Sequence, residues 1–242
     1  MIPPEGKCRE NDQDLRLSVI LTCQEIAARG LTHGTSGNVS VRRDAESFFI
    51  SPSGMAYEGL APADVPLVTF SGTWFGKRKP SSEWRFHRDI LAARSDIGAV
   101  VHTHSRHAVG LACTGQGIPA FHYMVAVAGG ADIRCAPYAT FGSQELSDHA
   151  VRALDGRMAC LLANHGVIAL GGNAASALAL AGEVENLAAQ YNAALQAGQP
   201  VLLENVEMDR VLEKFKTYGR QEGAEDALAF GGETVPGYIL KS

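Results

Sequence analysis

Segments of helical periodicity alternate along the chain with short runs of β-branched and aromatic residues, and this alternation constrains the fold more than any other feature. A helix is predicted from Asp12 to Arg29, where apolar residues recur at helical spacing before Gly30. Over residues 39–70, short apolar runs are separated by Ser-, Pro- and Gly-rich turns, which favours antiparallel strands. A sheet covered by helices on both faces is the simplest architecture for this pattern, so the sequence predicts one three-layer α/β domain.

The second half of the chain continues the alternation. The 174–197 segment is amphipathic, with Asn173 as its cap and Gly198 at its end, and its apolar stripe indicates core or a subunit contact. Residues 219–242 are rich in Gly and acidic residues, and they are predicted to form a mobile tail after a domain over 1–218. Further helices are predicted over 82–94, around Ala108 and over 143–154, and strands over 99–104, 133–135, 158–163 and 166–170.

Composition and charge exclude several classes of protein. The 242 residues are 46% hydrophobic and 19% charged, which fits a folded domain. With 26 acidic and 21 basic residues, the net charge of −5 offers no basic surface for nucleic acid or anionic lipid. No run approaches the ~20 apolar residues of a membrane span, and the first residues, MIPPEGKCRE, lack the apolar core of a signal peptide. We therefore expect a cytoplasmic protein with no nucleic-acid or membrane partner.

The five cysteines show no C-x-x-C spacing, which predicts reduced thiols.

The sharpest local motif is VVHTH at 100–104. Side chains two apart on a strand point to the same face, so His102 and His104 are predicted to lie side by side. His165 follows an apolar run and precedes Gly166, where a side chain at a strand end can reach a cavity. Three histidines with one open position are typical of a catalytic zinc site. Taken alone, two histidines on an apolar strand are structural or surface residues about as often as they are metal ligands.

Ser81, Ser82 and Glu83 stand where a loop is predicted to enter a helix. One interpretation is an N-cap with an acid placed favourably in the first turn. The other is an anion site at the helix N-terminus, with an acid that moves protons beside a metal. Spacing alone favours the N-cap.

Two Gly- and Ser-rich turns, at 34–38 and 51–54, are either ordinary tight turns or backbone cradles for an anion. Neither matches a P-loop or a dinucleotide fingerprint. His122 is left unassigned. The remaining histidines lack a partner at ligand spacing and are predicted to cap, pack or face water: His33, His87, His107 and His149.

In chain order, these motifs resemble the class II aldolase/adducin family over roughly residues 12–219. The likeness is closest to its L-fuculose-1-phosphate aldolases and to the related aldolases for 5-deoxyribulose and 5-methylthioribulose 1-phosphate. It rests on GTSGNVS at 34–40, SPSG at 51–54, PSSEWRFH at 80–87, VVHTH at 100–104, HYMVAVAGG at 122–130, CAPYATFG at 135–142, NHG at 164–166 and KFKTYG at 214–219.

The resemblance implies a homotetramer of α/β subunits with a mainly antiparallel sheet and one zinc ion per subunit, for which manganese or cobalt can substitute. It implies that His102, His104 and His165 bind the metal, and that Glu83 both visits the metal and transfers protons. Tyr123 is expected to act from the neighbouring subunit on the aldehyde oxygen. The implied phosphate cradle is Asn38, Ser53, Gly54, Ser81 and Ser82, and the implied acceptor pocket is Phe141, Phe215 and Tyr218.

The implied reaction is reversible cleavage of a ketose 1-phosphate, such as L-fuculose 1-phosphate or a 5-deoxypentulose 1-phosphate, into dihydroxyacetone phosphate and a short aldehyde. Two alternatives remain open: epimerisation, dehydration or decarboxylation of a sugar phosphate on the same fold, and a non-catalytic adducin-like interaction module. Asn164 stands where the fuculose type carries a histidine, and the stretch between His104 and Pro119 also differs. These departures leave the aldehyde partner open.

Overall fold

An eight-stranded sheet forms the centre of the molecule in the computed structural model, which describes residues 11–216. The strand order is β4-β3-β2-β1-β5-β8-β7-β6, and only β6 and β7 pair in parallel. The expected mainly antiparallel sheet is therefore confirmed. The strands are β1 (Asn38–Arg42), β2 (Ser47–Ile50), β3 (Leu67–Thr69), β4 (Trp74–Phe75), β5 (Ala99–Thr103), β6 (Arg134–Ala136), β7 (Ala159–Leu162) and β8 (Gly166–Gly171).

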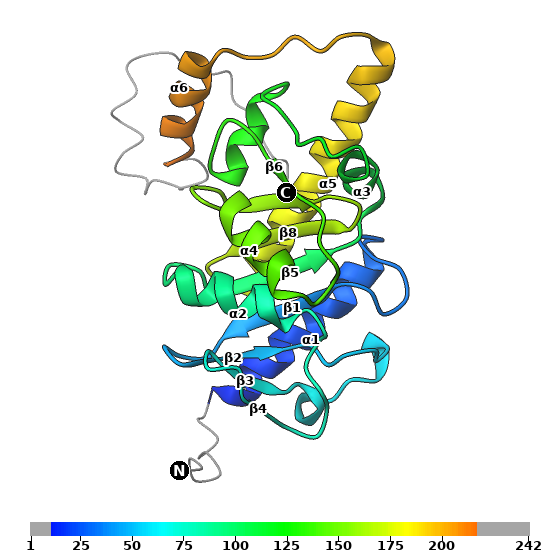
Figure 1. Ribbon diagram of the computed structural model, residues 1–242, viewed down its shortest axis with the longest axis vertical. Helices are drawn as coiled ribbons and strands as arrows, with labels where there is room; N and C mark the ends of the chain where they lie inside the picture. The colour runs from blue at the N-terminus through cyan, green and yellow to red at the C-terminus, as the bar shows by residue number, and fades with distance from the viewer. Residues whose placement is uncertain (1–10, 217–242) are drawn as a thin grey trace, which may run out of the picture.

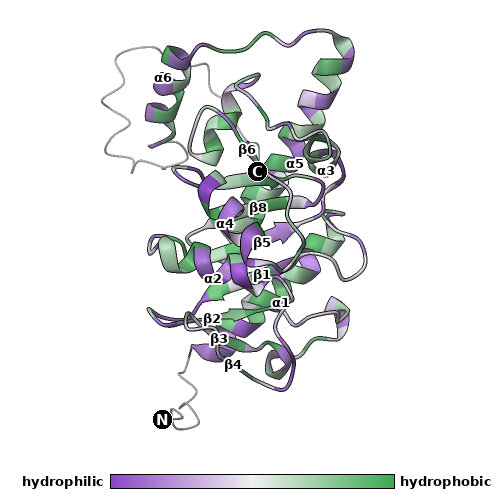
Figure 2. Ribbon diagram, in the orientation of Figure 1, coloured by the Kyte–Doolittle hydropathy of each residue, from purple (hydrophilic) through white to green (hydrophobic). Residues whose placement is uncertain are grey.

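Helices cover both faces of this sheet, as predicted (Figure 1). One apolar cluster joins the sheet to α1 (Asp12–Ala28), α3 (Arg106–Ala112) and α5 (Ala174–Ala197). The other joins its opposite face to α2 (Trp84–Ala93) and α4 (Gln144–Ala153). Figure 2 shows hydrophilic and hydrophobic colours side by side on α2 and α4, as expected for helices with one buried face.

Residues of β5 alternate between the two apolar clusters. Val101 packs with the cluster of α1 and α5, whereas Val100 packs with the cluster of α2 and α4. Because side chains alternate along a strand, His102 shares the face of Val100, and its ring lies edge-on to Phe86 of α2 at a centroid distance of 5.4 Å. The alternation thus directs His102 toward the start of α2.

Several boundaries and elements differ from the sequence prediction. The helix predicted over 82–94 begins at Trp84, which makes Glu83 the N-cap residue, and no side-chain cap hydrogen bond forms there. Glu83 therefore stands one residue before the first turn rather than in it as predicted; Ser81 Oγ accepts a hydrogen bond from its backbone N–H at 3.3 Å, and its side chain turns to other partners. β4 and α6 (Asn205–Phe215) were not predicted, since the first is very short and the second lies among polar residues.

Three further predictions concern the C-terminal tail, the cysteines and membrane-spanning helices. The tail over 219–242 lies outside the described residues. Within them, all four cysteines are free thiols, as predicted: Cys23, Cys113, Cys135 and Cys160. In the described part of the chain, no helix combines the length and the apolar character needed to cross a membrane.

α5 begins with the predicted cap. The Asn173 side chain accepts a hydrogen bond from the Ser176 amide at 2.9 Å, and the Ser176 hydroxyl in turn lies 3.2 Å from the Asn173 amide. This reciprocal arrangement satisfies two backbone donors at the start of the longest helix.

We expect Asn173→Ala to lower the free energy of unfolding by about 1 kcal/mol, because it removes the acceptor for a helix-terminal amide. Urea denaturation measures the change. Asn173→Asp keeps the acceptor and serves as the control, and equal stability of the alanine and aspartate variants would contradict the capping role.

Candidate active site and metal centre

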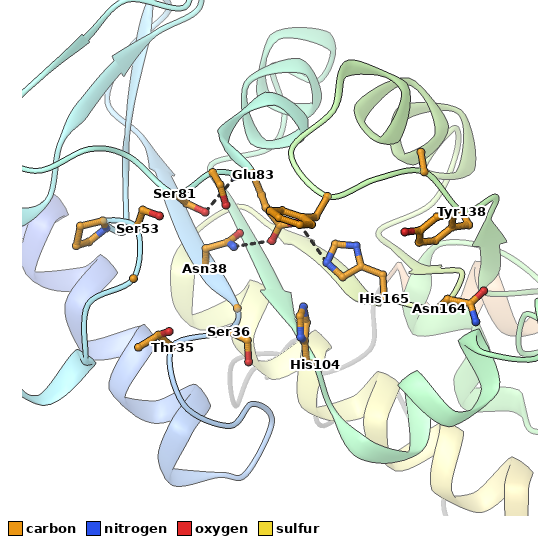
Figure 3. Close-up of a pocket in the computed structure, with 16 residues that line it drawn as sticks. Thr35, Ser36, Asn38, Ser53, Ser81, Glu83, His104, Tyr138, Asn164 and His165 are labelled. Atoms are coloured by element: carbon orange, nitrogen blue, oxygen red, sulfur yellow. Dashed lines mark hydrogen bonds and ion pairs between the residues drawn. The ribbon is translucent and has the colours of Figure 1, made fainter.

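Three histidines and one glutamate from three segments converge on a single point, and Figure 3 shows Glu83 with two of the histidines, His104 and His165. His102 lies on β5, His104 directly after it, and His165 in the turn that joins β7 to β8. The Nε2 atoms of His102 and His104 are 2.9 Å apart. Glu83, just before α2, brings Oε2 to 3.2 Å from His102 Nε2 and Oε1 to 3.2 Å from His165 Nε2. The four residues can offer ligand atoms that all lie within 4.8 Å of one another.

This donor set fits a divalent metal ion. In a tetrahedral site with bonds of about 2.0–2.2 Å, ligand atoms lie about 3.4 Å apart, close to the separations in this cluster. Glu83 Oε1 is buried and has no hydrogen-bond partner among the described residues, which a cation would remedy. His102 Nδ1 lies 2.9 Å from the Val167 carbonyl oxygen and donates to it, so Nε2 presents its lone pair to the cluster.

Electrostatics holds these groups in metal-binding forms. Burial alone would raise the pKa of the Glu83 carboxyl, but the adjoining imidazoles of His102 and His165 outweigh burial and hold that pKa well below its ordinary value. Burial, together with His102 and His165, lowers the pKa of His104 to about 4. At neutral pH the carboxylate is therefore ionised and the His104 ring is neutral, as metal ligation requires.

Two glycines allow the backbone to pack tightly around the cluster. A Cβ atom on Gly166 would lie 2.4 Å from the Thr103 carbonyl oxygen and 2.9 Å from Cε1 of His102. A Cβ on Gly37 would lie 2.9 Å from the His102 carbonyl oxygen, and the φ of Gly37 is +92°. Both positions need glycine, because any side chain would push apart the segments that carry the ligands.

The cluster forms one end of a pocket of about 280 Å³. The other end consists of hydroxyl-bearing and glycine residues from three segments, 35–37, 53–54 and 81–82. Gly37 and Gly54 have positive φ values, a backbone conformation that also occurs in anion-binding nests. The two Gly- and Ser-rich turns and the serine pair before α2, predicted separately, thus lie together in one pocket.

Asn38 connects the two ends of the pocket. It lines the pocket beside the hydroxyl-bearing residues, as expected for the cradle, and its Nδ2 donates to Glu83 Oε2 at 3.0 Å. The family resemblance implies only a phosphate-binding role for Asn38. Its contact with Glu83 depends on the pairing of β1 with β5, which sets Asn38 opposite His102.

Two of the three residues expected to shape the acceptor pocket, Phe141 and Phe215, line different pockets of the chain. Phe141 lines the pocket just described and is 66% exposed, so it stands at the rim. Tyr123 and Phe215 line a different pocket, between the 3₁₀ segment Tyr123–Ala128 and α6. Tyr218 lies outside the described residues. A single chain therefore does not bring Tyr123 to the metal cluster.

Of the remaining histidines, His33 is exposed and the other four make contacts within the fold. His107 pairs with Glu185, His149 bonds the Pro137 carbonyl oxygen, and His122 accepts from the Met124 amide. His87 is buried behind the site, where burial and the nearby His102 lower its pKa to about 3. The sequence signal that places His87 near Glu83 is their spacing of four residues, which is one helical turn. Tyr138 and Asn164 also line the pocket, although sequence reasoning assigned them no contact there.

Residues 18–192 match the family model described as the Class II Aldolase and Adducin N-terminal domain. The chain belongs to this family. It is 55% identical over 205 residues to the 5-methylthioribulose-1-phosphate/5-deoxyribulose-1-phosphate aldolase of Rhodospirillum rubrum, covering 85% of this chain and 92% of that one. It is 47% identical over 206 residues to the L-fuculose phosphate aldolase of Escherichia coli, covering 85% of this chain and 95% of that one.

A solved structure supports the same assignment. An L-fuculose 1-phosphate aldolase superposes with a TM-score of 0.81 at 40% identity, covering 84% of this chain and 96% of that one. The fold and family expected from the motifs are therefore confirmed.

We expect Gly166→Ala to reduce the bound metal strongly, since the added methyl group meets the Thr103 backbone between two ligands. Gly172→Ala is the matched control, because a Cβ there has no atom within 4 Å. Elemental analysis of both purified variants, with circular dichroism to establish folding, measures the effect. Metal content equal to that of the unchanged chain in folded Gly166→Ala protein would contradict the close approach.

Proposed function

We propose that this chain is a zinc-dependent aldolase that reversibly cleaves a ketose 1-phosphate into dihydroxyacetone phosphate and a short aldehyde. The observation that carries the proposal is the shared pocket, in which a three-histidine, one-carboxylate cluster lies beside an uncharged cradle of hydroxyl and N–H donors. A ketose 1-phosphate has a phosphate at one end and adjacent carbonyl and hydroxyl oxygens next to it, which matches this pairing. The relatives named as fuculose-phosphate and deoxyribulose-phosphate aldolases support this substrate class.

The metal ligands would be His102, His104 and His165, with Glu83 as the fourth. Three imidazoles and a carboxylate suit zinc, and such borderline ligands also accept manganese or cobalt. A divalent ion held there supplies a Lewis acid for the negative charge of the enediolate left by carbon–carbon cleavage. In the described residues, no lysine lines the pocket, so no Schiff-base nucleophile is at hand.

The protein's own groups perform the remaining steps. The cradle, with Ser53, Gly54, Ser81 and Ser82, holds the phosphate and so fixes the ketose along the pocket. In the aldol direction the ionised Glu83 carboxylate takes a proton from the third carbon of dihydroxyacetone phosphate. In cleavage, the bond between the third and fourth carbons breaks, and Glu83, having taken up a proton from water, delivers it to the third carbon. Its Oε2 atom is held by Asn38, whereas Oε1 has His165 Nε2 beside it at 3.2 Å and lacks a well-formed hydrogen bond.

The proton on the aldehyde-side oxygen requires another group. We assign this step to Tyr123 of a neighbouring subunit, because Tyr123 is 48% exposed and lies outside the pocket of its own chain. A homotetramer, as in the family resemblance, would let each site combine Glu83 of one subunit with a tyrosine of the next. The complete metal cluster favours this catalytic reading over an adducin-like interaction module, which needs no metal ligands.

Glu83→Gln and Ser82→Ala should separate proton transfer from phosphate binding. Glu83→Gln removes the base but leaves three histidines, so we expect bound zinc to be largely retained and turnover to fall roughly 10²–10⁴-fold. Ser82→Ala weakens ground and transition states alike, so KM should rise while kcat is nearly kept.

The measurement is a panel of ketose 1-phosphates with coupled detection of dihydroxyacetone phosphate, alongside metal analysis. The residues implied for the acceptor pocket, Phe141, Phe215 and Tyr218, are themselves uncharged, so 5-deoxy ketose 1-phosphates should be cleaved better than ketose diphosphates. Turnover of Glu83→Gln near the normal rate would contradict the proton-transfer role. Formation of an epimeric ketose without dihydroxyacetone phosphate would favour epimerisation instead.

Hybrid assemblies test the shared site. Tyr123→Phe and Glu83→Gln chains, each nearly inactive alone, should regain activity when co-assembled, because some sites then combine an intact Glu83 with an intact Tyr123. Light scattering establishes the assembly, and each variant mixed with itself is the control. An absence of gain in proven hybrids, or a fully active monomer, would count against Tyr123 acting across an interface.

A further inference from the structure

A row of buried polar side chains leads from the sheet to the catalytic carboxylate. Ser40 Oγ lies 2.7 Å from His87 Nδ1, and His87 Nε2 is hydrogen-bonded to Asn38 Oδ1. Asn38 Nδ2 then lies 3.0 Å from Glu83 Oε2. Ser40 and His87 are fully buried and Asn38 is 4% exposed, so water does not compete for these hydrogen bonds.

The chemistry of these groups makes every hydrogen bond in the row run from Ser40 toward Glu83. An ionised Glu83 only accepts, so the Asn38 amide must turn its NH₂ group toward Oε2. The amide oxygen then faces His87 and also only accepts, which requires a proton on His87 Nε2. Because the ring is neutral, Nδ1 is an acceptor, and Ser40 donates to it.

The position of the His87 ring is fixed on its other sides by packing. Phe86 stacks on it with ring centroids 4.6 Å apart, and the same Phe86 contacts His102 edge-on. A ring that cannot turn keeps its Nε2 aimed at Asn38, and Asn38 in turn keeps its NH₂ group aimed at Glu83. One carboxylate oxygen is thereby held, while the other remains without a hydrogen bond.

We propose that His87 is a positioning residue that sets the orientation of the Asn38 amide and so holds the Glu83 carboxylate for proton transfer. The proposal rests on the proposed function for its kinetic consequence. If the hydrogen bond from His87 Nε2 is lost, the Asn38 amide is free to turn its oxygen toward Glu83, and like partial charges then push the carboxylate out of place. A histidine that only filled space would be insensitive to which of its nitrogens carries the proton.

Two isosteric substitutions separate these roles. The amide nitrogen of glutamine superposes on the Nε2 position of histidine, whereas the amide nitrogen of asparagine superposes on Nδ1. We expect His87→Asn to lower kcat roughly 10–100-fold, the usual effect of losing a group that orients a ligand, with KM and zinc content nearly unchanged. His87→Gln should recover most of kcat. His149→Asn, a partly exposed histidine of α4 that does not line the pocket, is the control.

A spectroscopic measurement tests the same assignment without relying on turnover. In the metal-free chain labelled with ¹⁵N-histidine, long-range proton–nitrogen correlation at neutral pH should show His87 in the Nε2–H form, its signals identified by their loss in His87→Gln. An Nδ1–H form overturns the proposal, as do equal kcat values for the Asn and Gln variants. If the unchanged chain cleaves no ketose phosphate, the proposed function is wrong. The measurement of which His87 nitrogen carries the proton still tests the row of hydrogen bonds.

Discussion

The site depends on the pairing of three neighbouring strands at the centre of the sheet. β5 pairs with β1 so that Asn38 stands opposite His102, and with β8 so that Thr103 stands opposite Val167. Gly37 and Gly166 permit this approach, because a Cβ at either position would collide with the β5 backbone. A shift of one residue in either pairing would send the ligand side chains to the other face of the sheet.

The same pairing explains why acid and metal ligands lie beside an anion cradle. β1 begins at Asn38, directly after the turn that supplies hydroxyl and N–H groups, and α2 begins directly after Ser81, Ser82 and Glu83. Segments 35–38 and 81–83 therefore contribute to both ends of the pocket. A ketose 1-phosphate held by its phosphate as proposed would have its reacting carbons near the cluster.

The sequence predicts the parts of this site that follow local rules. His102 and His104 follow the two-residue period of a strand, and the cap at Asn173 follows helix chemistry. Local rules do not predict the contact of Asn38 with Glu83 or that of His87 with Asn38, since both arise only when β1, β5 and α2 pack together. The sequence does not predict α6, a helix in which most residues remain partly exposed and only Met208 is fully buried. Tyr123 and Phe215 share a pocket that lies apart from the cluster within one chain, a separation that no local pattern encodes.

Diffraction at the zinc absorption edge, from crystals grown with zinc, tests the convergence of these ligands most directly. We expect one anomalous peak per chain, about 2.0–2.2 Å from Nε2 of His102, His104 and His165. A peak at another position, or no peak among these atoms with zinc in excess, would contradict the assignment of this cluster as the metal centre.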